Sequence, residues 1–326
     1  LVLNYEGMGT GDPDVYKAFC NRFLKLNGKN FASLGVVLPR SAFSAAGSFN
    51  FRKELLSSYT KSNITILKNK KGWVFEEVTE QYSIVLLSSL KSTKFNHLVE
   101  LKGPLFSIED LEKSKNESGV TFNSNDIKNW NDTLSFPALP DQFSAEIFLK
   151  LRKHFRFDRK VDDDWRGRPD REIDATLQKP LMDLDSEICP EGYWPVYKGK
   201  SFNIWEPDQK SYYAWCEPKE ALKWLQNKRL RAYRSSRDSV HKEYSLEFIQ
   251  DESNLPPKRF RIVFRDLARA SDKRTVIACL IPKKVFLTNT APFLHFPIGD
   301  EKDQTFILGV LCSIPLDWYA KRFVEI

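Results

Sequence analysis

Basic residues recur along the stretch from Arg259 to Asn289, and their spacing is the clearest indication in the sequence of a site that could bind an anionic ligand. At its start, apolar residues alternate with arginines, which predicts a half-buried strand with one packed face and one cationic face. The apolar positions are Phe260, Ile262 and Phe264, and the cationic positions are Arg259, Arg261 and Arg265. Two more strands are expected over residues 275–281 and 285–288. A cationic sheet face can hold a polyanion, or it can be a solvated surface without a ligand.

A second group with possible chemistry is acidic and lies between Val161 and Leu177. Its carboxylates are Asp162, Asp163, Asp164, Asp170, Glu172 and Asp174. Clustered carboxylates together with a lysine would suit a metal-dependent nuclease. The interleaved Arg166, Arg168 and Arg171 favour internal ion pairs instead, so both interpretations stay open.

Two further segments place basic residues where they could contact phosphate. Within residues 194–205, Lys198 and Lys200 flank a turn glycine beside aromatic residues. This arrangement suits contacts to phosphate and sugar, or an ordinary hairpin with a packed Trp. A helix is predicted over residues 218–233, with Arg229 in the basic cluster towards its end. Basic residues there also complement the helix dipole, so their charge alone requires no ligand.

The N-terminal elements that must position any site are predicted to alternate between helix and strand. Residues 7–14 are rich in glycine, but a phosphate-binding loop follows a buried strand and too few residues precede this one. We interpret it as a loop with Asp14 as a helix cap, and Val15, Phe19, Phe23 and Leu26 fall on one face of the predicted helix. The remaining predictions are a buried parallel strand at 31–38, a helix at 49–58, a strand at 63–67 and an edge hairpin formed by 73–78 and 82–90.

Several of these segments resemble, in order and spacing, the second half of an adenine-specific DNA methyltransferase. They are DVYKAFCNRFLKL (14–26), LGVVLPRSAF (34–43), FRKELL (51–56) and GWVFEEV…YSIVLL (72–87). The resemblance is to the group in which a target-recognition domain follows the catalytic domain, including type IIG restriction–modification and phage-defence methylases. Three C-terminal segments are also similar to that group: WPVYKGKSFNIW (194–205), FRDLARASDKRTVIACLIP (264–282) and ILGVLCSIPLDWYAKRF (307–323).

The resemblance implies part of a Rossmann-like α/β methyltransferase domain, followed by a mixed α+β target-recognition domain. It implies that Asp14, Tyr16 and Phe19 contact S-adenosylmethionine, and that Phe75 stacks on a flipped adenine whose N6 receives the methyl group. Taken alone, Phe75 would be interpreted as a core residue. The family's Asn-Pro-Pro-aromatic catalytic tetrapeptide precedes the matching region and does not occur in this chain. We therefore expect no methyl transfer without an N-terminal methyltransferase half, in the same or a separate chain.

Double-stranded DNA is the expected partner of the second half of the chain. The residues predicted to contact it are Lys198, Lys200, Arg229, Arg261, Arg265, Arg269, Lys273, Arg274 and Lys283. The predicted domains are 1–95 for the methyltransferase part, 96–143 for a linker or insertion with a short helix at 108–113, and 144–326 for target recognition.

Composition indicates a globular protein of 326 residues with a net charge of +7. No apolar run is long enough to predict a membrane span, neither end resembles a signal peptide, and we expect a fragment of a longer protein. The five cysteines are scattered and histidines are few, which argues against zinc and against a disulfide framework and favours a cytoplasmic location.

A second class of function stays open. The chain could be a DNA-binding specificity module without a catalytic role, similar to the recognition subunits of multisubunit restriction systems. The absent tetrapeptide favours this alternative, whereas the match over residues 14–90 argues against it.

Overall fold

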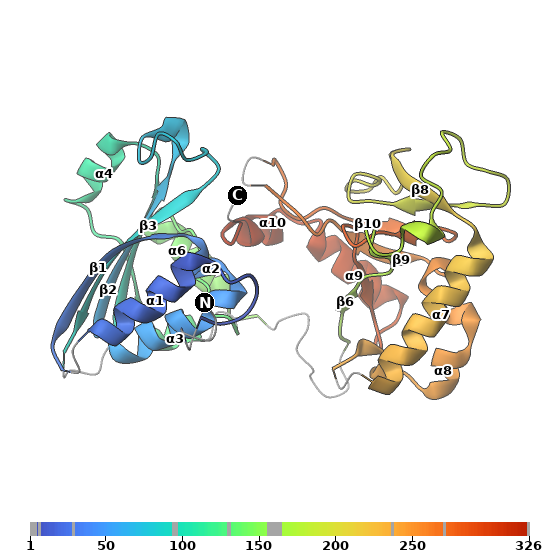
Figure 1. Ribbon diagram of the computed structural model, residues 1–326, viewed down its shortest axis with the longest axis horizontal. Coiled ribbons are helices and arrows are strands. Elements are labelled where there is room, and N and C mark those ends of the chain that lie inside the picture. The colour runs from blue at the N-terminus through green and yellow to red at the C-terminus, as the bar shows by residue number, and fades with distance from the viewer. Residues whose placement is uncertain are drawn as a thin grey trace. The chain divides into compact units, whose positions relative to one another are not determined.

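The computed structural model describes residues 5, 8–27, 30–92, 97–128, 132–154, 165–235, 238–269 and 272–324. The chain forms two compact units, each with its own sheets and helices (Figure 1). Unit 1 comprises Leu1–His154, Arg269–Ser271 and Tyr319–Ile326, and unit 2 comprises Phe155–Ala268 and Asp272–Trp318. Among the described residues, no helix has the length and apolar character needed to cross a lipid bilayer.

Unit 1 is built on a five-stranded mixed sheet in the order β1-β3-β2-β4-β5. The strands are β1 (Ala32–Pro39), β2 (Lys61–Lys68), β3 (Ser83–Lys91), β4 (Leu98–Leu105) and β5 (Val120–Asn123). β3 is antiparallel to both of its neighbours, β2 and β4 run parallel, and β5 is antiparallel to β4. Together with the helices this confirms the predicted α/β class.

The predictions for the strands around β1 need correction. β1 was expected to be a buried parallel strand, but it is an edge strand of the described sheet, antiparallel to β3. Its alternate residues Ser33, Gly35 and Val37 are exposed, while Leu34 and Leu38 are buried. Residues 73–78 form no strand, and β3 lies between β1 and β2 rather than in an edge hairpin. A short apolar run fits an edge strand with one packed face as well as it fits a central strand.

The helices of unit 1 are α1 (Val15–Leu26), α2 (Ser41–Ser44), α3 (Phe49–Ser58), α4 (Ile108–Ser114), α5 (Ser124–Lys128) and α6 (Gln142–Leu151). α1 packs against α3 and β1, and Figure 1 shows α1 and α3 lying across the sheet. The apolar face of α1 is largely uncovered: Val15, Phe19 and Leu26 are each more than half exposed, and Lys17 is buried.

Residues 97–128 and 132–143, within the segment expected to be a linker or insertion, are part of the folded unit. β4 and β5 within it complete the sheet, and Val99, Leu101 and Phe122 are buried. The predicted short helix is present as α4, where the Ser107 side chain accepts a hydrogen bond from the backbone N–H of Asp110. Arg52 of α3 is fully buried and donates to the Thr133 carbonyl, which ties this segment to α3.

Unit 2 combines two sheets with helices, which agrees with the predicted mixed architecture. One sheet has the order β10-β9-β12-β6 and the other has the order β11-β7-β8. The strands are β6 (Arg168–Asp170), β7 (Trp194–Tyr197), β8 (Tyr212–Cys216), β9 (Arg261–Phe264), β10 (Ala278–Ile281), β11 (Phe286–Leu287) and β12 (Phe293–His295). The helices are α7 (Pro218–Ser235), α8 (Leu246–Gln250) and α9 (Glu301–Leu311), with the 3-10 turn η5 at Val240–Glu243. The helix α10 (Ile314–Lys321) begins in unit 2, and its residues from Tyr319 belong to unit 1.

The core of unit 2 lies between these elements. One apolar cluster joins both sheets through Tyr197, Val263, Ile281 and Leu287, all nearly inaccessible to solvent. A second cluster packs Leu225 of α7 against the β7-β8 sheet. Because β9 is covered on both faces, its side chains cannot be divided into a packed and a cationic face.

Candidate functional site

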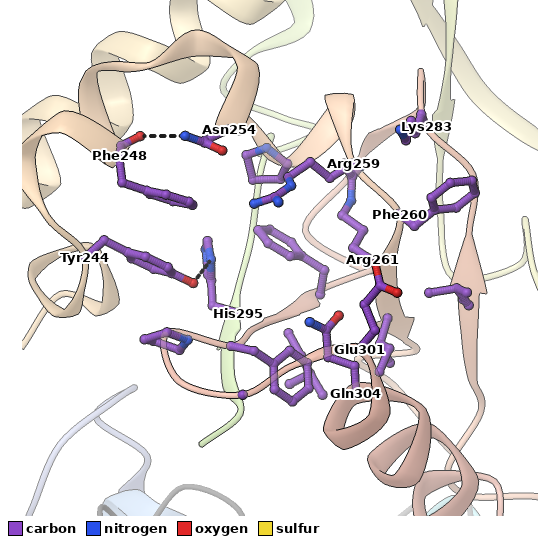
Figure 2. A pocket seen from close by; sticks show the side chains of 18 of the residues that line it. Tyr244, Phe248, Asn254, Arg259, Phe260, Arg261, Lys283, His295, Glu301 and Gln304 are labelled. Atoms are coloured by element: carbon purple, nitrogen blue, oxygen red, sulfur yellow. Dashed lines mark hydrogen bonds between the residues drawn. The ribbon is translucent and has the colours of Figure 1, made fainter. Parts of the chain in front are cut away.

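Residues of unit 2 line a cavity of about 810 Å³. Residues of β9, β12, η5, α8 and α9 line it, and Figure 2 shows their side chains converging on it. Its aromatic wall comprises Tyr244, Phe248, Phe260, Phe293 and Phe296. Cationic Arg259 and Lys283 lie at the same cavity, so the site combines flat apolar surfaces with positive charge.

Aromatic and cationic groups of this wall are paired with each other. The rings of Tyr244 and Phe248 stack with centroids 4.5 Å apart and planes 8° apart. The Arg259 guanidinium lies 5.9 Å from the Phe248 ring centroid, and the Lys283 ammonium lies 5.3 Å from the ring of Phe260, which is 58% exposed. Exposed aromatic faces beside cations can stack on bases and attract phosphate. Sequence reasoning missed Tyr244 and Phe248, because their helical turns are short and carry no motif.

Arg261 was expected on a cationic surface and is instead buried, with 4% of the residue exposed. Its guanidinium lies 3.2 Å from Glu172 Oε1 and donates to the Val285 carbonyl at 2.6 Å. Glu172 also accepts the backbone N–H of Leu287 at 2.8 Å. Burial raises the pKa of Glu172 to about 7, an effect that Arg261 opposes, and burial lowers the pKa of Arg261. Arg261 is therefore almost wholly buried by this ion pair, although it also lines the cavity.

Arg229 is the second predicted DNA contact that the structure places inside the protein. It is 4% exposed, and its guanidinium donates to Gln226 Oε1 at 2.5 Å and to the Asp251 carbonyl at 3.0 Å. Desolvation lowers its pKa. The helical periodicity of α7 turns Arg229 to the same packed side as Leu225 and Gln226, so the prediction of a surface contact here is wrong.

The turn that carries Lys198 and Lys200 lies beside Arg265. Gly199 donates its N–H to Thr290 Oγ1 at 3.2 Å, and a side chain at that position would contact Arg265. Arg265 is half-buried and donates to the Phe202 carbonyl at 2.9 Å, and burial lowers its pKa. The structure therefore brings Lys198, Lys200 and Arg265 together, with Lys200 the exposed member.

The other predicted basic contacts differ in how free their side chains are. Arg274 is anchored by the Cys312 carbonyl at 2.6 Å and lies 3.6 Å from Asp317, which gives it a structural role. Arg269, Lys273 and Lys283 are exposed. Of the predicted set, Lys200, Lys273 and Lys283 are the most accessible cations that unit 2 offers to a ligand.

The acidic stretch does not form a carboxylate cluster in its described part. Asp162, Asp163 and Asp164 lie outside the described residues. Glu172 pairs with Arg261, and Asp174 accepts backbone N–H groups in its own turn. The arginines do form ion pairs, as expected, but with carboxylates from elsewhere: Arg166 and Arg168 with Glu243, and Arg171 with Asp266.

Asp170 instead meets two histidines. Its Oδ2 lies 3.1 Å from His295 Nε2 and 3.6 Å from His241 Nε2. Burial raises the pKa of Asp170, but the His295 hydrogen bond and nearby positive charges outweigh it, so the pKa is lowered. Burial lowers the pKa of His241 to about 4, so this imidazole is neutral at neutral pH. Sequence reasoning missed this group, because its members are spread over more than a hundred residues.

In unit 1, the three residues expected to contact S-adenosylmethionine lie at the start of α1. Asp14 is the N-cap residue and is exposed, with its carboxylate 3.9 Å from Lys17 Nζ. Tyr16 hydroxyl lies 3.2 Å from Ser48 Oγ, and the exposed Phe19 ring stacks on Phe23 at 5.8 Å. An accessible carboxylate and an accessible ring are groups that fit a ligand with hydroxyl groups and an aromatic base. Their exposure keeps them available.

Phe75 lies on a surface loop, and 47% of it is exposed, so it is not a core residue. The fully buried Asn69 shapes this loop. Its Oδ1 accepts the N–H groups of Val74 and Phe75 at 3.0 Å, and its amide donates to the carbonyls of Phe75 and Val78 at 2.8 and 2.7 Å. One amide thus fixes the backbone on both sides of the ring, a role that the sequence did not reveal.

No protein-family model and no curated protein sequence matches the chain. Among solved structures, 99% of the chain is similar to 36% of a nuclease-deletion mutant of the type ISP restriction–modification enzyme LlaGI in complex with a DNA substrate mimic, with 10% identity and a TM-score of 0.51. The type IIL restriction–modification enzyme MmeI in complex with DNA is similar at 12% identity and a TM-score of 0.41, over 91% of this chain and 37% of MmeI. The type IIG restriction endonuclease BpuSI is similar at 15% identity and a TM-score of 0.34, over 96% of this chain and 40% of BpuSI. The chain spans about two fifths of these proteins or less, and the likeness to LlaGI shows a shared fold.

Proposed function

We propose that this chain supplies target recognition, and part of the cofactor site, to an adenine-N6 DNA methyltransferase of a restriction–modification system. The observation that carries the proposal is the fold likeness to LlaGI over 99% of the chain, which includes both units. The residues of the methyltransferase resemblance support it independently, because they lie in both halves of the chain.

The proposed DNA contacts of unit 2 are the exposed basic groups, with Arg229 and Arg261 removed from the set. Lys200, Lys273 and Lys283 neutralise phosphates, and Arg259 and Phe260 at the cavity add a cation and an accessible ring. Phosphate contacts give affinity and register, whereas base reading requires side chains that reach a groove.

The proposed role of unit 1 is to hold the methyl donor and the flipped base. Asp14, Tyr16 and Phe19 fit one side of an S-adenosylmethionine site, and this cofactor would supply the methyl group. Phe75 presents a ring whose backbone Asn69 holds in place, which suits stacking on an extruded adenine.

The partner that we propose for unit 1 is a methyltransferase half that adds strands beside β1. An edge strand carries unpaired backbone donors and acceptors along its outer side, which a further strand can pair with. The exposed Val37 of β1, and Phe19 and Leu26 of α1, provide apolar surface for that half to cover.

DNA binding is tested by titrating short duplexes with the chain at two salt concentrations. The Lys200→Ala/Lys283→Ala variant should bind more weakly, and its log-log salt slope should fall by about 2, since each lost phosphate contact removes about one unit. Lys113→Ala, at an exposed lysine of α4, is the matched control and should leave the slope unchanged. Absence of binding by the wild-type chain at low salt would contradict the recognition role.

A non-catalytic specificity module is the second candidate, favoured by the absence of the Asn-Pro-Pro-aromatic tetrapeptide from these residues. Binding of S-adenosylmethionine, measured by calorimetry with and without Asp14→Ala, separates the two. Binding that the variant weakens supports the methyltransferase. DNA binding without cofactor binding, also after the N-terminal half is added, supports the specificity module.

A further inference from the structure

Three side chains with metal-binding atoms converge in unit 2: Asp170 at the end of β6, His241 in η5 and His295 at the end of β12. One possible ligand atom from each lies within 4.8 Å of the others, and the described residues contain no other group of three such side chains. Two of the four histidines of the whole chain meet here on one carboxylate. His295 and Asp170 are within hydrogen-bond distance, and the rings of His241 and His295 meet edge to face with centroids 5.3 Å apart.

We propose that Asp170, His241 and His295 bind a divalent first-row transition metal ion, with zinc the best match, in the wall of the unit 2 cavity. A zinc ion with bonds of about 2.0–2.1 Å in tetrahedral geometry holds its ligand atoms about 3.3 Å apart. The Asp170 Oδ2 distances to His295 Nε2 and His241 Nε2, 3.1 and 3.6 Å, bracket that value. The two distances from the carboxylate thus already match the spacing that the ion requires, and all three ligand atoms lie within 4.8 Å of one another.

Hydrogen bonds orient two of the three ligands. Asp170 Oδ1 accepts the backbone N–H of Arg171 at 2.8 Å, which leaves Oδ2 directed at the imidazoles. His295 Nδ1 lies 3.4 Å from the Tyr244 hydroxyl, so a metal on Nε2 would find the other ring nitrogen already partnered. Ring nitrogens and carboxylates of metal sites are held in this way by outer partners. Asp170 and Phe293 are opposite each other in the β6-β12 ladder, which places His295 on the same face as Asp170.

His241 is the third ligand of the proposed site. Its ring is buried, and its Nε2 faces Asp170 Oδ2 at 3.6 Å. An ion on Nε2 would bridge this gap to Asp170. The other ring nitrogen, Nδ1, makes no hydrogen bond to any described residue, so His241 is the ligand that outer partners hold least.

The donor set selects the class of ion. Two imidazoles with one carboxylate suit zinc, cobalt, nickel or ferrous iron, whereas Mg²⁺ and Ca²⁺ take oxygen ligands. Three protein ligands leave a position for water or for an oxygen of a bound molecule. His241 and His295 both line the cavity, so a ligand there can reach the ion (Figure 2 labels His295). Because the three ligands are far apart in the sequence, no motif of closely spaced residues indicates the site.

The experiment is titration of the untagged, metal-stripped chain with Zn²⁺ by calorimetry, and with Co²⁺ by visible absorption. The wild type should bind one equivalent of each metal. The visible absorption band of the bound Co²⁺ should be that of an ion with a low coordination number. Asp170→Asn and His295→Gln should weaken Zn²⁺ binding at least tenfold. Tyr244→Phe keeps the ring against Phe248 and removes only the hydroxyl, so it should weaken binding about tenfold.

His154→Ala and Cys189→Ser are the controls, since His154 is exposed in unit 1 and Cys189 is an exposed thiol. Both should bind as the wild type does, and near-ultraviolet circular dichroism checks that each variant is folded. The proposal is overturned if the wild type binds no Zn²⁺, if Mg²⁺ binds as well as Zn²⁺, or if Asp170→Asn and Tyr244→Phe bind as the wild type does. If His295→Gln does not fold, Tyr244→Phe still decides.

Discussion

Replacing Arg261 by methionine tests the inference that this arginine stabilises unit 2 and does not contact a ligand. The substitution preserves much of the aliphatic stem and removes the charge that faces Glu172 at 3.2 Å. It also leaves the Val285 carbonyl without its 2.6 Å donor and removes the cation that lies 5.5 Å from the Phe293 ring. The carboxylate of Glu172 keeps the Leu287 N–H at 2.8 Å.

The loss of unfolding free energy expected for Arg261→Met depends on pH, because it depends on whether Glu172 is ionised. Removing one partner of a buried ion pair costs about 3–5 kcal/mol, because the remaining charge is uncompensated. That cost applies where Glu172 is ionised. Burial raises its folded pKa to about 7, above its unfolded value near 4.5, and loss of Arg261 raises it further. A raised carboxyl pKa favours the folded state below the unfolded pKa, and this contribution is lost as the pH rises through the folded pKa. At pH 5 both proteins carry neutral Glu172, and the remaining cost is about 1–3 kcal/mol for the orphaned carbonyl.

The assay is urea unfolding followed by Trp fluorescence at pH 5 and pH 8, in parallel with DNA binding. Arg261→Met should be more strongly destabilised at pH 8 than at pH 5, and adding Glu172→Gln should restore part of the loss at pH 8. Arg259→Met, one of the exposed arginines beside it, should change stability by no more than about 0.5 kcal/mol. The reasoning is refuted if Arg261→Met unfolds at the wild-type urea concentration at both pH values and yet loses DNA affinity.

Three further predictions concern single positions in the two units. Asn69→Ala removes four loop hydrogen bonds and should cost about 1–3 kcal/mol, with faster limited proteolysis of the loop that follows it. Gly9→Ala should prevent stable folding of unit 1, because a Cβ there would lie 1.8 Å from the Gly47 carbonyl oxygen. Gly72 also has a positive φ, 70°, but open space around it, so Gly72→Ala should lower the free energy of unfolding, measured by thermal denaturation, by only about 1–2 kcal/mol. Asp300 caps α9, and bonds from the backbone N–H of Asp303 and its neighbours hold its pKa below 3.8. Its contribution is therefore present above that pH and lost on acidification, and Asp300→Ala should flatten the acid side of the stability profile.

The sequence was informative about where elements lie and less so about which side of each is covered. α1 begins after Asp14, as the cap predicts, but its apolar stripe is exposed and Lys17 is inside. Lys17 can be buried because its ammonium donates to the Thr10 and Asp12 carbonyls at 3.1 and 2.6 Å. Periodicity detects an apolar face, but the element that covers that face is not encoded in the helix itself.

The same limit explains the basic stretch. Alternation predicted β9 as a strand, and the run at 275–281 predicted its neighbour β10; both are strands, yet Arg261 is buried and Phe260 is exposed. Arg261 is buried because Glu172, 89 positions away in the sequence, provides a buried carboxylate that pairs with its guanidinium. The Asp170–His241–His295 group was equally beyond reach, since only the fold brings those three residues together. Phe75 was singled out by resemblance, while the buried amide that shapes its loop carries no signal in sequence.

The open side of β1 has a practical consequence for work with this polypeptide. Strands without lateral cover pair readily with identical strands of other molecules, above all where apolar residues such as Val37 flank the unpaired backbone. β1 carries no charged residue along its length that would discourage such pairing. Preparations of unit 1 by itself should therefore aggregate in a concentration-dependent way, and a lysine introduced at Val37 should delay this without altering the folded monomer.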